Sequence, residues 1–584
     1  MLKQDYYNDF FEFGQQKMNF SFFELHVPDD DPVYTLKKVM EDLDFSGLLA
    51  CYSDKGRTGY NPIMMYAVVT YANMRGVRAV DRIVELCERD LAFIWLTKGQ
   101  KPRRDAFYDF KGKKLTGEVL DELNYQFLRR LKKEGLLTLK ELFIDGTKIE
   151  ANANRYTFVW RGTLNYHLAG LLDSIDALYG KYNAFLHENG YGPKYDLGDA
   201  RMFVIEGMEK VRRVIEKNRK RKLTKHKKLP NHTILESDNC SPLEILKLQR
   251  NLIRIAQGEG IGFVQGKGKY KPEIQKLYEE LEECGTRLMG YKDCFEIMGK
   301  DRNSDSKTDL EATFMRMKED PMLNGQLKPA YNVQIAVENY FIMHGYVSND
   351  RTDYNTLIPV LEKHRKAFGE NCLKEVTADS GYCSEKNLLY LKRNGITSYI
   401  KLQDHEKRKS RAYQEDIGKY SNMKYEVFED EHYYVCHDGR ELRHIRTEKK
   451  EQDGYTQTIE VYGCADCSGC EHKSKCLYRY KEEKPDREKV MKINERWEEL
   501  KEESNRNIQS EKGILNRQIR FIQTEGHFGD IKENENFRRF HYRSAEKVYK
   551  EFMLYAIGRN INKYHRFLHG EIQKYEGKKD PKTA

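Results

Sequence analysis

Hydrophobic residues recur at helical spacing through the first quarter of the chain. An apolar run over residues 62–74 opens with a proline, which is favoured at the first helical position, and follows Asn61, a good N-cap. Apolar residues three and four apart predict further helices over 77–96 and 115–133. We therefore expect a helical N-terminal domain over residues 1–138. Its basic flanks suit DNA binding or assembly, although the same pattern describes a plain helical core.

A strand pattern begins at residue 142. Three apolar residues lead to Asp145 and Gly146, and the alternation resumes as far as Ile149. Asp–Gly after apolar β-formers predicts either a hairpin turn or a strand that carries a carboxylate. In the second case the carboxylate needs a cation or a hydrogen-bond donor, because burying a lone charge costs free energy.

Strand patterns return after residue 330. The predicted elements are a hairpin over 330–350 that turns at 338–339, a helix over 355–368, a strand over 375–379 that ends on Asp379, a helix over 384–393 and a strand over 396–402. With the strand at 142–149 the order is β-β-β-α-β-α-β, which resembles that of a ribonuclease-H-like sheet. We therefore predict an α/β fold with a ribonuclease-H-like catalytic core.

A helical insertion at residues 156–300 interrupts this core. Helical patterns cover 166–185, 202–217 and 272–291. The last of these has a short coiled-coil seam, with apolar residues spaced alternately three and four apart. The seam residues are Ile274, Leu277, Leu281, Cys284, Leu288 and Tyr291.

A second, β-rich insertion is predicted at residues 403–485. Its strand-like pieces are 425–428, 433–436 and 456–461. The core would then consist of residues 139–155, 301–402 and a helical part at 486–570, followed by a disordered tail at 571–584.

Composition and charge narrow the class of protein. The 584 residues are 33% charged with a mean hydropathy of −0.81. No stretch approaches the roughly 18 apolar residues of a membrane span, and the start lacks a secretory leader, so we expect a cytoplasmic protein with no membrane partner. The net charge is +9, and eight of the twelve residues at 217–228 are basic, with a second basic stretch at 101–114. Such runs suit nucleic acid, since each neutralised phosphate releases counterions; solvated surface is the alternative.

Three acidic residues are candidates for catalysis. Asp145 and Asp379 lie in or at the end of predicted strands, and Glu525 lies in a basic helical stretch. Two strand-borne aspartates and a helix-borne glutamate are the arrangement that holds two Mg²⁺ ions for in-line attack on a phosphodiester. Carboxylates are needed because Mg²⁺ is a hard cation that prefers oxygen ligands.

Six segments, taken in order, carry a resemblance to a known family. They are TGYNPIMMYAVVTYANMRGVRAVDRIVELCERDLAFIWL, FIDGTKIEANANRYTFVW, DLEATFMRMKEDPMLNGQLKPAYNVQIAV, TADSGY, TEGHFGDIK and FRRFHYRSAEKVYKEFMLYAIGRNINK. The chain resembles the DDE-type bacterial insertion-sequence transposases, specifically the IS eleven-eighty-two branch with its InsH-like N-terminal domain. The resemblance implies that Asp145, Asp379 and Glu525 are the catalytic triad and bind two Mg²⁺ ions, for which Mn²⁺ can substitute.

The resemblance also draws attention to basic residues near Glu525. Related transposases carry a Tyr–Arg–Glu–Lys signature with the arginine four residues before the glutamate, whereas here that position is Phe521 and the arginine is Arg520. The lysine matches at Lys532, seven residues after Glu525 and on the same face of a regular helix. Both basic residues are therefore predicted to contact DNA phosphates. Further predicted DNA contacts are Lys148 and, with ordinary basic surface as the alternative, Arg538, Arg539 and Arg543.

Four of the twelve cysteines lie within thirteen residues, at Cys464, Cys467, Cys470 and Cys476. In a cytoplasmic chain such spacing indicates metal binding more often than disulfides. Four thiolates complete the tetrahedral shell of Zn²⁺ and leave no open position, so we predict a structural zinc site. Cys436 and His472 are spare ligands, and free thiols or an iron–sulfur cluster are the alternatives.

Together these features predict a DNA transposase. It would bind the terminal inverted repeats of its element, cleave the DNA with Mg²⁺ and join the freed 3′-OH to a double-stranded target. A homodimer or larger assembly is expected because two DNA ends must meet, and the protein would associate with the nucleoid. The alternatives are a ribonuclease-H-like nuclease that cuts without joining and a domesticated DNA-binding protein without catalysis.

Overall fold

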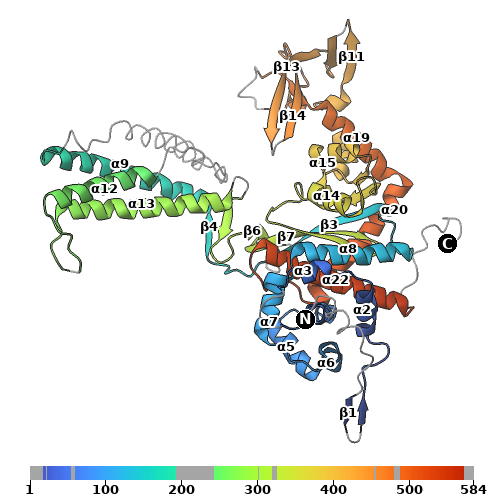
Figure 1. The fold of residues 1–584 in the computed structure, drawn as a ribbon. Helices are drawn as coiled ribbons and strands as arrows, with labels where there is room; N and C mark the ends of the chain where they lie inside the picture. Colours follow the sequence, from blue (N-terminus) through green and yellow to red (C-terminus); the bar gives the residue numbers. More distant parts are fainter. Residues whose placement is uncertain are drawn as a thin grey trace.

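The protein has a central body from which a helical arm and a small sheet extend (Figure 1). The computed structural model describes residues 18–20, 23–53, 59–191, 242–266, 268–299, 302–317, 325–429, 431–452, 455–478, 480 and 487–570. The helix predicted at 202–217, the basic run at 217–228 and the tail at 571–584 lie outside these residues. Among the helices described, none is both long and apolar enough to cross a membrane.

A six-stranded sheet forms the centre of the body. Its strands are β3 (Glu141–Glu150), β6 (Thr313–Arg316), β7 (Leu327–Glu338), β8 (Phe341–Ser348), β9 (Glu375–Ala378) and β10 (Thr397–Ile400). They lie in the order β10-β9-β3-β7-β6, with β8 also paired to β7. Strands β3, β9 and β10 are parallel, and β7 is antiparallel to β3, β6 and β8. Helix α15 (Glu385–Arg393) makes the crossover between the parallel neighbours β9 and β10, and α14 (Leu357–Phe368) connects β8 to β9 across the sheet.

Strand β3 continues through Asp145 and Gly146, so the hairpin-turn alternative for these residues is wrong. The strand stays paired with β7 on both sides of them. Glycine is needed at 146 because an added Cβ would lie 2.5 Å from the Gln334 Nε2 atom on β7. The Asp–Gly pair therefore marks a close approach between strands, and it is not a turn.

The predicted hairpin of β7 and β8 is confirmed. Its turn residues, Asn339 and Tyr340, have positive φ angles of 47° and 66°. Two consecutive positive φ angles are typical of the type I′ turn, whose twist matches that of the flanking strands.

Short helices fill the N-terminal part of the chain. After a small hairpin of β1 (Met18–Phe20) and β2 (Phe23–Leu25) come α2 (Pro32–Glu41), α3 (Ser46–Ala50), α4 (Pro62–Met74), α5 (Val80–Arg89), α6 (Leu91–Thr97), α7 (Arg104–Asp109), the π-helical turn η1 (Phe110–Lys114) and α8 (Gly117–Lys133). The predicted N-cap is confirmed, since the Asn61 side chain accepts hydrogen bonds from two N–H groups in the first turn of α4. The single helix predicted over 77–96 is wrong. Asp90 separates α5 from α6 because its side chain caps the start of α6.

Helix α4 joins the N-terminal helices to the rest of the body. It is buried along its whole length and packs against the last helix, α22 (Ala545–Leu568). At the crossing an added Cβ on Gly558 would lie 2.9 Å from the Met74 backbone nitrogen, so only glycine fits. One continuous hydrophobic cluster extends from these helices to β3, β8 and α14. The N-terminal helices therefore share a core with the central sheet.

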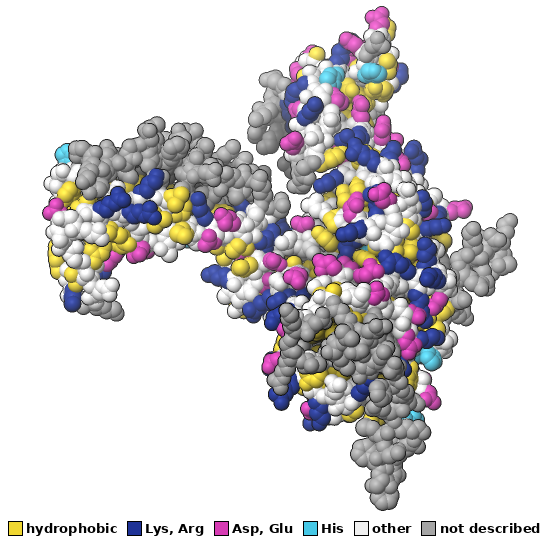
Figure 2. Space-filling model, in the orientation of Figure 1, with side chains coloured by type: hydrophobic (Ala, Val, Ile, Leu, Met, Phe, Trp, Pro, Cys, Tyr) yellow, Lys and Arg dark blue, Asp and Glu magenta, His cyan; other side chains and the backbone are white. Residues whose placement is uncertain are grey.

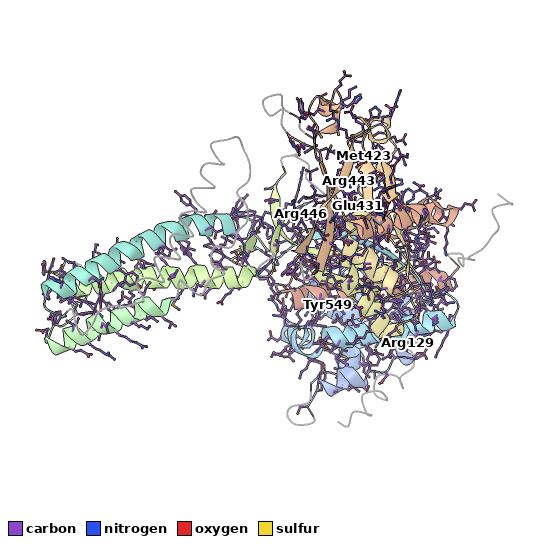
Figure 3. The ribbon with its side chains drawn as sticks, turned by 90° about the horizontal axis from the view of Figure 1, so that it is seen from above. Arg129, Met423, Glu431, Arg443, Arg446 and Tyr549 are labelled. Carbon is purple, nitrogen blue, oxygen red and sulfur yellow. The ribbon has the colours of Figure 1, made fainter. Side chains whose placement is uncertain are left out.

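The arm consists of α9 (Arg161–Glu188), α12 (Pro242–Gly258) and α13 (Glu273–Met298), and it extends away from the body in both views (Figures 1 and 3). These helices pack around a hydrophobic cluster of their own. The seam predicted on α13 is confirmed, because five of its six residues are buried and Tyr291 is half-buried. Two short antiparallel strands, β4 (Phe158–Trp160) and β5 (Ser304–Ser306), form the neck of the arm.

The second insertion forms a five-stranded antiparallel sheet at the far end of the molecule (Figure 1). Its strands are β11 (Lys424–Phe428), β12 (Glu431–Val435), β13 (Glu441–Gln452), β14 (Tyr455–Cys464) and β15 (Val490–Ile493). Short turns flank it: α16 (His405–Arg408), α17 (Arg411–Gln414), η3 (Tyr420–Asn422) and α18 (Lys473–Cys476). Because β15 completes this sheet, the prediction that residues from 486 onward are helical is wrong at its start.

Strand β13 was not predicted, because its sequence ELRHIRTEKKEQ has almost no apolar residues. It pairs with β14 through ten residues of each strand, and its side chains form ion pairs on the surface. Arg443 pairs with Glu431 on β12, and Arg446 pairs with Glu448 on its own strand (Figure 3).

The C-terminal helices return to the central sheet. They are α19 (Glu495–Gln509), α20 (Glu511–Arg520), η4 (Phe521–Glu525), α21 (Gly526–Gly529), η5 (Asp530–Asn534) and then α22. Both η4 and η5 are π-helical, and such wide turns are frequent at functional sites.

Candidate active site

Asp145 is a buried carboxylate in the middle of β3. It is 6% exposed, and its Oδ1 atom accepts a hydrogen bond of 2.8 Å from the Gly146 N–H. Two groups from the C-terminal helices approach its Oδ2 atom: the Thr524 hydroxyl at 3.3 Å and the Arg520 Nη1 atom at 3.0 Å. The predicted need for a cation and for donors beside a buried carboxylate is thus met.

Asp379 follows β9 directly and lies beside Asp145. The parallel register pairs Ile144 with Ala378, so the two aspartates occupy the next position on neighbouring strands. Burial raises the pKa of Asp379, and the nearby negative charges of Asp145 and Asp353 raise it further. Opposing this, the Gly381 N–H donates to its Oδ1 atom at 2.8 Å. Like charges held together in this way favour a bound cation.

Asp353 is a third acid at this place, and it was not predicted. It lies in the loop between β8 and α14, where its Oδ1 atom accepts hydrogen bonds from Asn332 Nδ2 at 2.7 Å and Gln334 Nε2 at 2.9 Å. A Cβ added to Gly381 would lie 3.0 Å from Asp379 Oδ1 and 3.2 Å from Asp353 Oδ2. Both carboxylates therefore border one small space that glycine keeps open.

Buried polar residues on β7 support these acids. Gln334 donates to Asp353 and to Asn332, and its carbonyl oxygen accepts a hydrogen bond from the Tyr382 hydroxyl. Asn332, Gln334 and Tyr382 are all essentially inaccessible to solvent. The sequence signal for Asp353 is indirect. Asn332 and Gln334 are polar residues at alternate positions of an otherwise apolar strand, which indicates that they have a polar partner nearby.

Glu525 is next to the site along the chain. It ends η4, which packs against β3, and it directly follows the Thr524 that approaches Asp145. The Glu525 side chain is exposed, and within the described part of the chain no three His, Cys, Asp or Glu side chains are grouped closely enough to hold a metal ion. The role of Glu525 as the third carboxylate stays a prediction.

The π-helical turns change which residues share a helical face. Lys532 is 6% exposed whereas Glu525 is exposed, so the prediction that they lie on one face is wrong. A seven-residue spacing returns to the same face only at 3.6 residues per turn, and η4 and η5 have wider turns. Arg520, expected to contact phosphate, is instead paired with Asp145.

The remaining predicted DNA contacts lie near the far end of β3. The Lys148 amine donates to the Arg316 carbonyl at 3.2 Å. Three exposed arginines follow η5, and each donates hydrogen bonds to the protein. Arg538 donates to the Lys532 carbonyl and to the Glu533 carboxylate, Arg539 donates to the Ala153 carbonyl, and Arg543 donates to the Asn152 carbonyl. On the face shown in Figure 2, Lys and Arg side chains are interspersed with acids and do not form a single block.

The cysteine cluster lies at the end of β14. Cys464 is buried beside Cys467, and burial raises the pKa of the Cys464 thiol to about 11. Cys436 adjoins them from the turn after β12, and Cys476 has Cys436, Cys467 and Cys470 as neighbours. The fold brings the predicted cysteines and Cys436 into one neighbourhood, but in the described residues no three of them are close enough to hold one metal ion, so the zinc site stays a prediction.

Two parts of the chain match known family models. Residues 435–565, which include Glu525, match one described as a transposase DDE domain, and residues 21–113 match one described as a transposase domain (DUF772). The two matches support a DDE-type transposase. Asp145, Asp379 and the arm lie outside both matched regions. No curated protein and no solved structure matches the chain.

Proposed function

We propose that this protein is a Mg²⁺-dependent DNA transposase with a ribonuclease-H-like catalytic core. The observation that carries the proposal is that the buried Asp145 and the partly buried Asp379 lie side by side, at equivalent positions along the neighbouring parallel strands β3 and β9. The sheet contains the predicted strands and helices in the predicted β-β-β-α-β-α-β succession, with one strand that was not predicted, β6, inserted between β3 and β7 along the chain. Both family matches are to transposase domains.

The acids at the site fit Mg²⁺ through their donor chemistry. Asp145, Asp379 and Asp353 offer carboxylate oxygens, and Glu525 is the fourth candidate. Bound metal supplies an activated nucleophile and stabilises the leaving oxygen. The chain itself holds Asp145 and Asp379 side by side: Arg520 pairs with Asp145, and the backbone N–H groups of Gly146 and Gly381 donate to one aspartate each.

The other parts of the proposal concern partners. The substrates are the ends of the element and a double-stranded target, contacted by the exposed arginines near residue 540. Two ends must be held together, which requires a homodimer or larger assembly, and the protein acts at the nucleoid in the cytoplasm. The cysteines of the small sheet bind a structural Zn²⁺, drawn from Cys436, Cys464, Cys467, Cys470 and Cys476. Ribonuclease-H-like nuclease activity is the second candidate, because one site of this kind can cut without joining.

A strand-transfer assay tests the function. Purified protein is incubated with labelled element-end DNA and a plasmid target, with Mg²⁺ or EDTA, as wild type, Asp379→Ala and the exposed-acid control Glu370→Gln. We expect joined product that requires Mg²⁺, is lost in Asp379→Ala and is kept in Glu370→Gln. Cleavage without joining would identify the nuclease, and binding without cleavage would leave a DNA-binding protein.

A further inference from the structure

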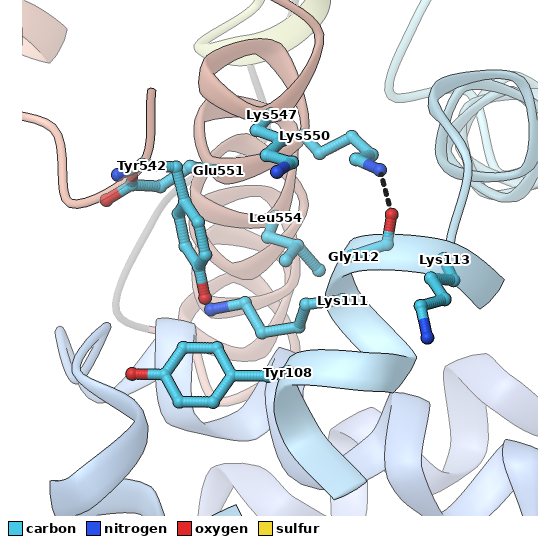
Figure 4. Close-up of a pocket in the computed structure, with 9 residues that line it drawn as sticks. All are labelled: Tyr108, Lys111, Gly112, Lys113, Tyr542, Lys547, Lys550, Glu551 and Leu554. Carbon is cyan, nitrogen blue, oxygen red and sulfur yellow. Dashed lines mark hydrogen bonds between the residues drawn. The ribbon is translucent and has the colours of Figure 1, made fainter. Parts of the chain in front are cut away.

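A cavity between the N-terminal helices and α22 lies apart from the acids. It has a volume of about 370 Å³ and is lined by Tyr108, Lys111, Gly112, Lys113, Tyr542, Lys547, Lys550, Glu551 and Leu554 (Figure 4). This volume falls within the lower part of the range of small-ligand sites, roughly 300–1,000 Å³, and exceeds the share of a single water. The lining includes Tyr108 and Lys111–Lys113 from the basic stretch at 101–114, but none of the residues predicted individually to be catalytic or to contact DNA.

Four lysines face a single acid in this cavity, and that acid is already neutralised. Glu551 is 2% exposed and pairs with Arg78 at 2.8 Å. It also accepts hydrogen bonds from the His541 N–H at 3.0 Å and the Tyr542 N–H at 3.2 Å. Glu551 therefore has little capacity left to balance the lysines.

Two of the lysines already have hydrogen-bond or ion-pair partners. Lys550 donates to the Gly112 carbonyl at 3.0 Å, drawn as the dashed line in Figure 4, and to Glu546 at 3.1 Å. Lys113 pairs with Asp109 at 2.9 Å and is 78% exposed. These two lysines contribute positive potential but are already engaged.

Lys111 and Lys547 differ from that pair, because among the described residues neither has an acid within ion-pair distance. Lys111 is 6% exposed, lies within the π-helical turn η1, and has its amine 5.0 Å from the centre of the Tyr542 ring. Burial lowers the pKa of Lys111 to about 8. A buried ammonium without a carboxylate is costly, and an anion entering the cavity would remove that cost. Lys547 is exposed on α22 at the side of the same cavity.

The walls favour an anion that carries a flat ring. Tyr108 is 41% exposed, and the buried Leu554 forms part of the cavity wall. Bases stack on tyrosine rings with little dependence on sequence. The cavity is also larger than a single inorganic phosphate needs, so its size favours a nucleotide over inorganic phosphate as the ligand.

We propose that this cavity binds one nucleotide unit of a DNA strand, with its phosphate at Lys111 and Lys547 and its base against Tyr108. The site joins one residue stretch from each of the two transposase matches, since Tyr108–Lys113 fall in the first and Tyr542–Leu554 in the second. It is a second DNA contact, separate from the catalytic acids, and it rests on the proposed function in taking the ligand to be DNA.

Binding measurements test the proposal. Anisotropy of a labelled oligonucleotide is followed as a function of salt in EDTA, for the wild type, Lys111→Met, Lys547→Gln and the exposed control Lys133→Gln. Each cavity variant should weaken binding about tenfold and reduce the slope of log K against log salt by about 1, as loss of one phosphate contact requires. Lys133→Gln should match the wild type. Unchanged affinity and slope in both cavity variants would overturn the proposal.

The choice of variants and two further measurements separate the ways in which the proposal can fail. Lys547 is exposed, so Lys547→Gln tests the site even if Lys111→Met fails to fold. Deoxyadenosine monophosphate and inorganic phosphate are titrated in parallel; retention of oligonucleotide binding in a variant that loses either small anion would overturn the DNA assignment. Strand transfer is assayed separately, so a protein that binds DNA through the cavity but never joins strands would refute the transposase function and support the cavity.

Discussion

The paired strands β3 and β9 carry two adjacent acidic residues at each end, but the surroundings of the two acidic pairs differ. At the end where both strands begin, Glu141 lies directly opposite Glu375, which pairs with Lys512. The Lys512 side chain is 53% exposed. Burial, followed by the charge of Glu375, raises the pKa of Glu141 to about 7. At this end the pKa of one acid is raised toward neutrality, and the other acid pairs with a solvent-exposed lysine.

At the other end, Asp145 pairs with a largely buried arginine, Arg520, and Asp379 lies beside them. The Arg520 side chain is 16% exposed, against 8% for Asp145. A third acid, Asp353, and the bare backbone of Gly381 complete the surroundings. The comparison teaches that paired acids alone do not form a site. Fixed donors, a buried counter-charge and open space beside the oxygens distinguish the second end from the first.

The largest expected difference between the two ends is in activity. Asp379→Asn should lower strand transfer by about 100-fold or more, because it removes an anionic ligand while preserving shape. Glu375→Gln, at the other end of the same strand, should leave the rate within about threefold. Rates are measured at saturating Mg²⁺. A large loss in both variants would mean that the sheet, and not the site, is being damaged.

The next difference is in stability. Arg520→Met leaves Asp145 buried without its cation and should cost about 3–5 kcal/mol of unfolding free energy. Lys512→Met removes an exposed partner and should cost less than about 1 kcal/mol. Urea unfolding without metal measures both, and added Mg²⁺ should restore part of the Arg520→Met loss only. Equal losses in the two variants would contradict the contrast drawn here.

The pH dependence of stability should reveal the protonated glutamate. Because folding raises the pKa of Glu141 from 4.5 to about 7, the folded state binds the proton more tightly. Its contribution to stability is complete below pH 4.5 and is lost as the pH rises through about 7. Glu141→Gln should therefore stabilise the protein by about 1–3 kcal/mol at pH 8 and by almost nothing at pH 4. A constant difference across that range would refute the assignment.

The smallest effect concerns the space beside the carboxylates. Gly381→Ala places a methyl group 3.0–3.2 Å from oxygens of Asp379 and Asp353 and should raise the Mg²⁺ concentration for half-maximal activity about tenfold. Gly180→Ala, on the arm and open to solvent, is the matched control. An unchanged Mg²⁺ requirement would show that the space is not used by metal.

Strands, and the acidic residues that follow them, could be predicted wherever a single local sequence pattern determines the structure. Apolar runs that end on an acid predicted β9 with Asp379, and alternation predicted the β7–β8 hairpin. Glu525 was proposed from its place in a basic helical stretch and from the family resemblance, and its role stays a prediction. Whether β3 continues or turns at Asp145 could not be decided locally. Gly146 makes room for Gln334, which belongs to a strand almost two hundred residues away, and no local sequence pattern indicates this contact.

Other features depend on contacts that no periodicity encodes. Asp353 lies in an ordinary polar loop and is recruited by Asn332 and Gln334. Strand β13 is too polar for a hydrophobic pattern and forms because β14 supplies its hydrogen bonds. The prediction that Lys532 shares a helical face with Glu525 failed because it assumed 3.6 residues per turn, whereas the π-helical turns contain more. Asp90 is a local N-cap signal for a new helix, but the apolar periodicity across 77–96 led to the prediction of one continuous helix.

The neck of the arm has a consequence for how such a gene can change length. Trp160 and Ser304 are directly paired across β4 and β5, so the chain leaves the body and returns to it at adjoining points. Neighbouring strands lie about 5 Å apart, a gap that a two-residue turn spans. The segment between these residues can thus be shortened, lengthened or replaced without moving apart the two points at which the chain leaves and re-enters the body.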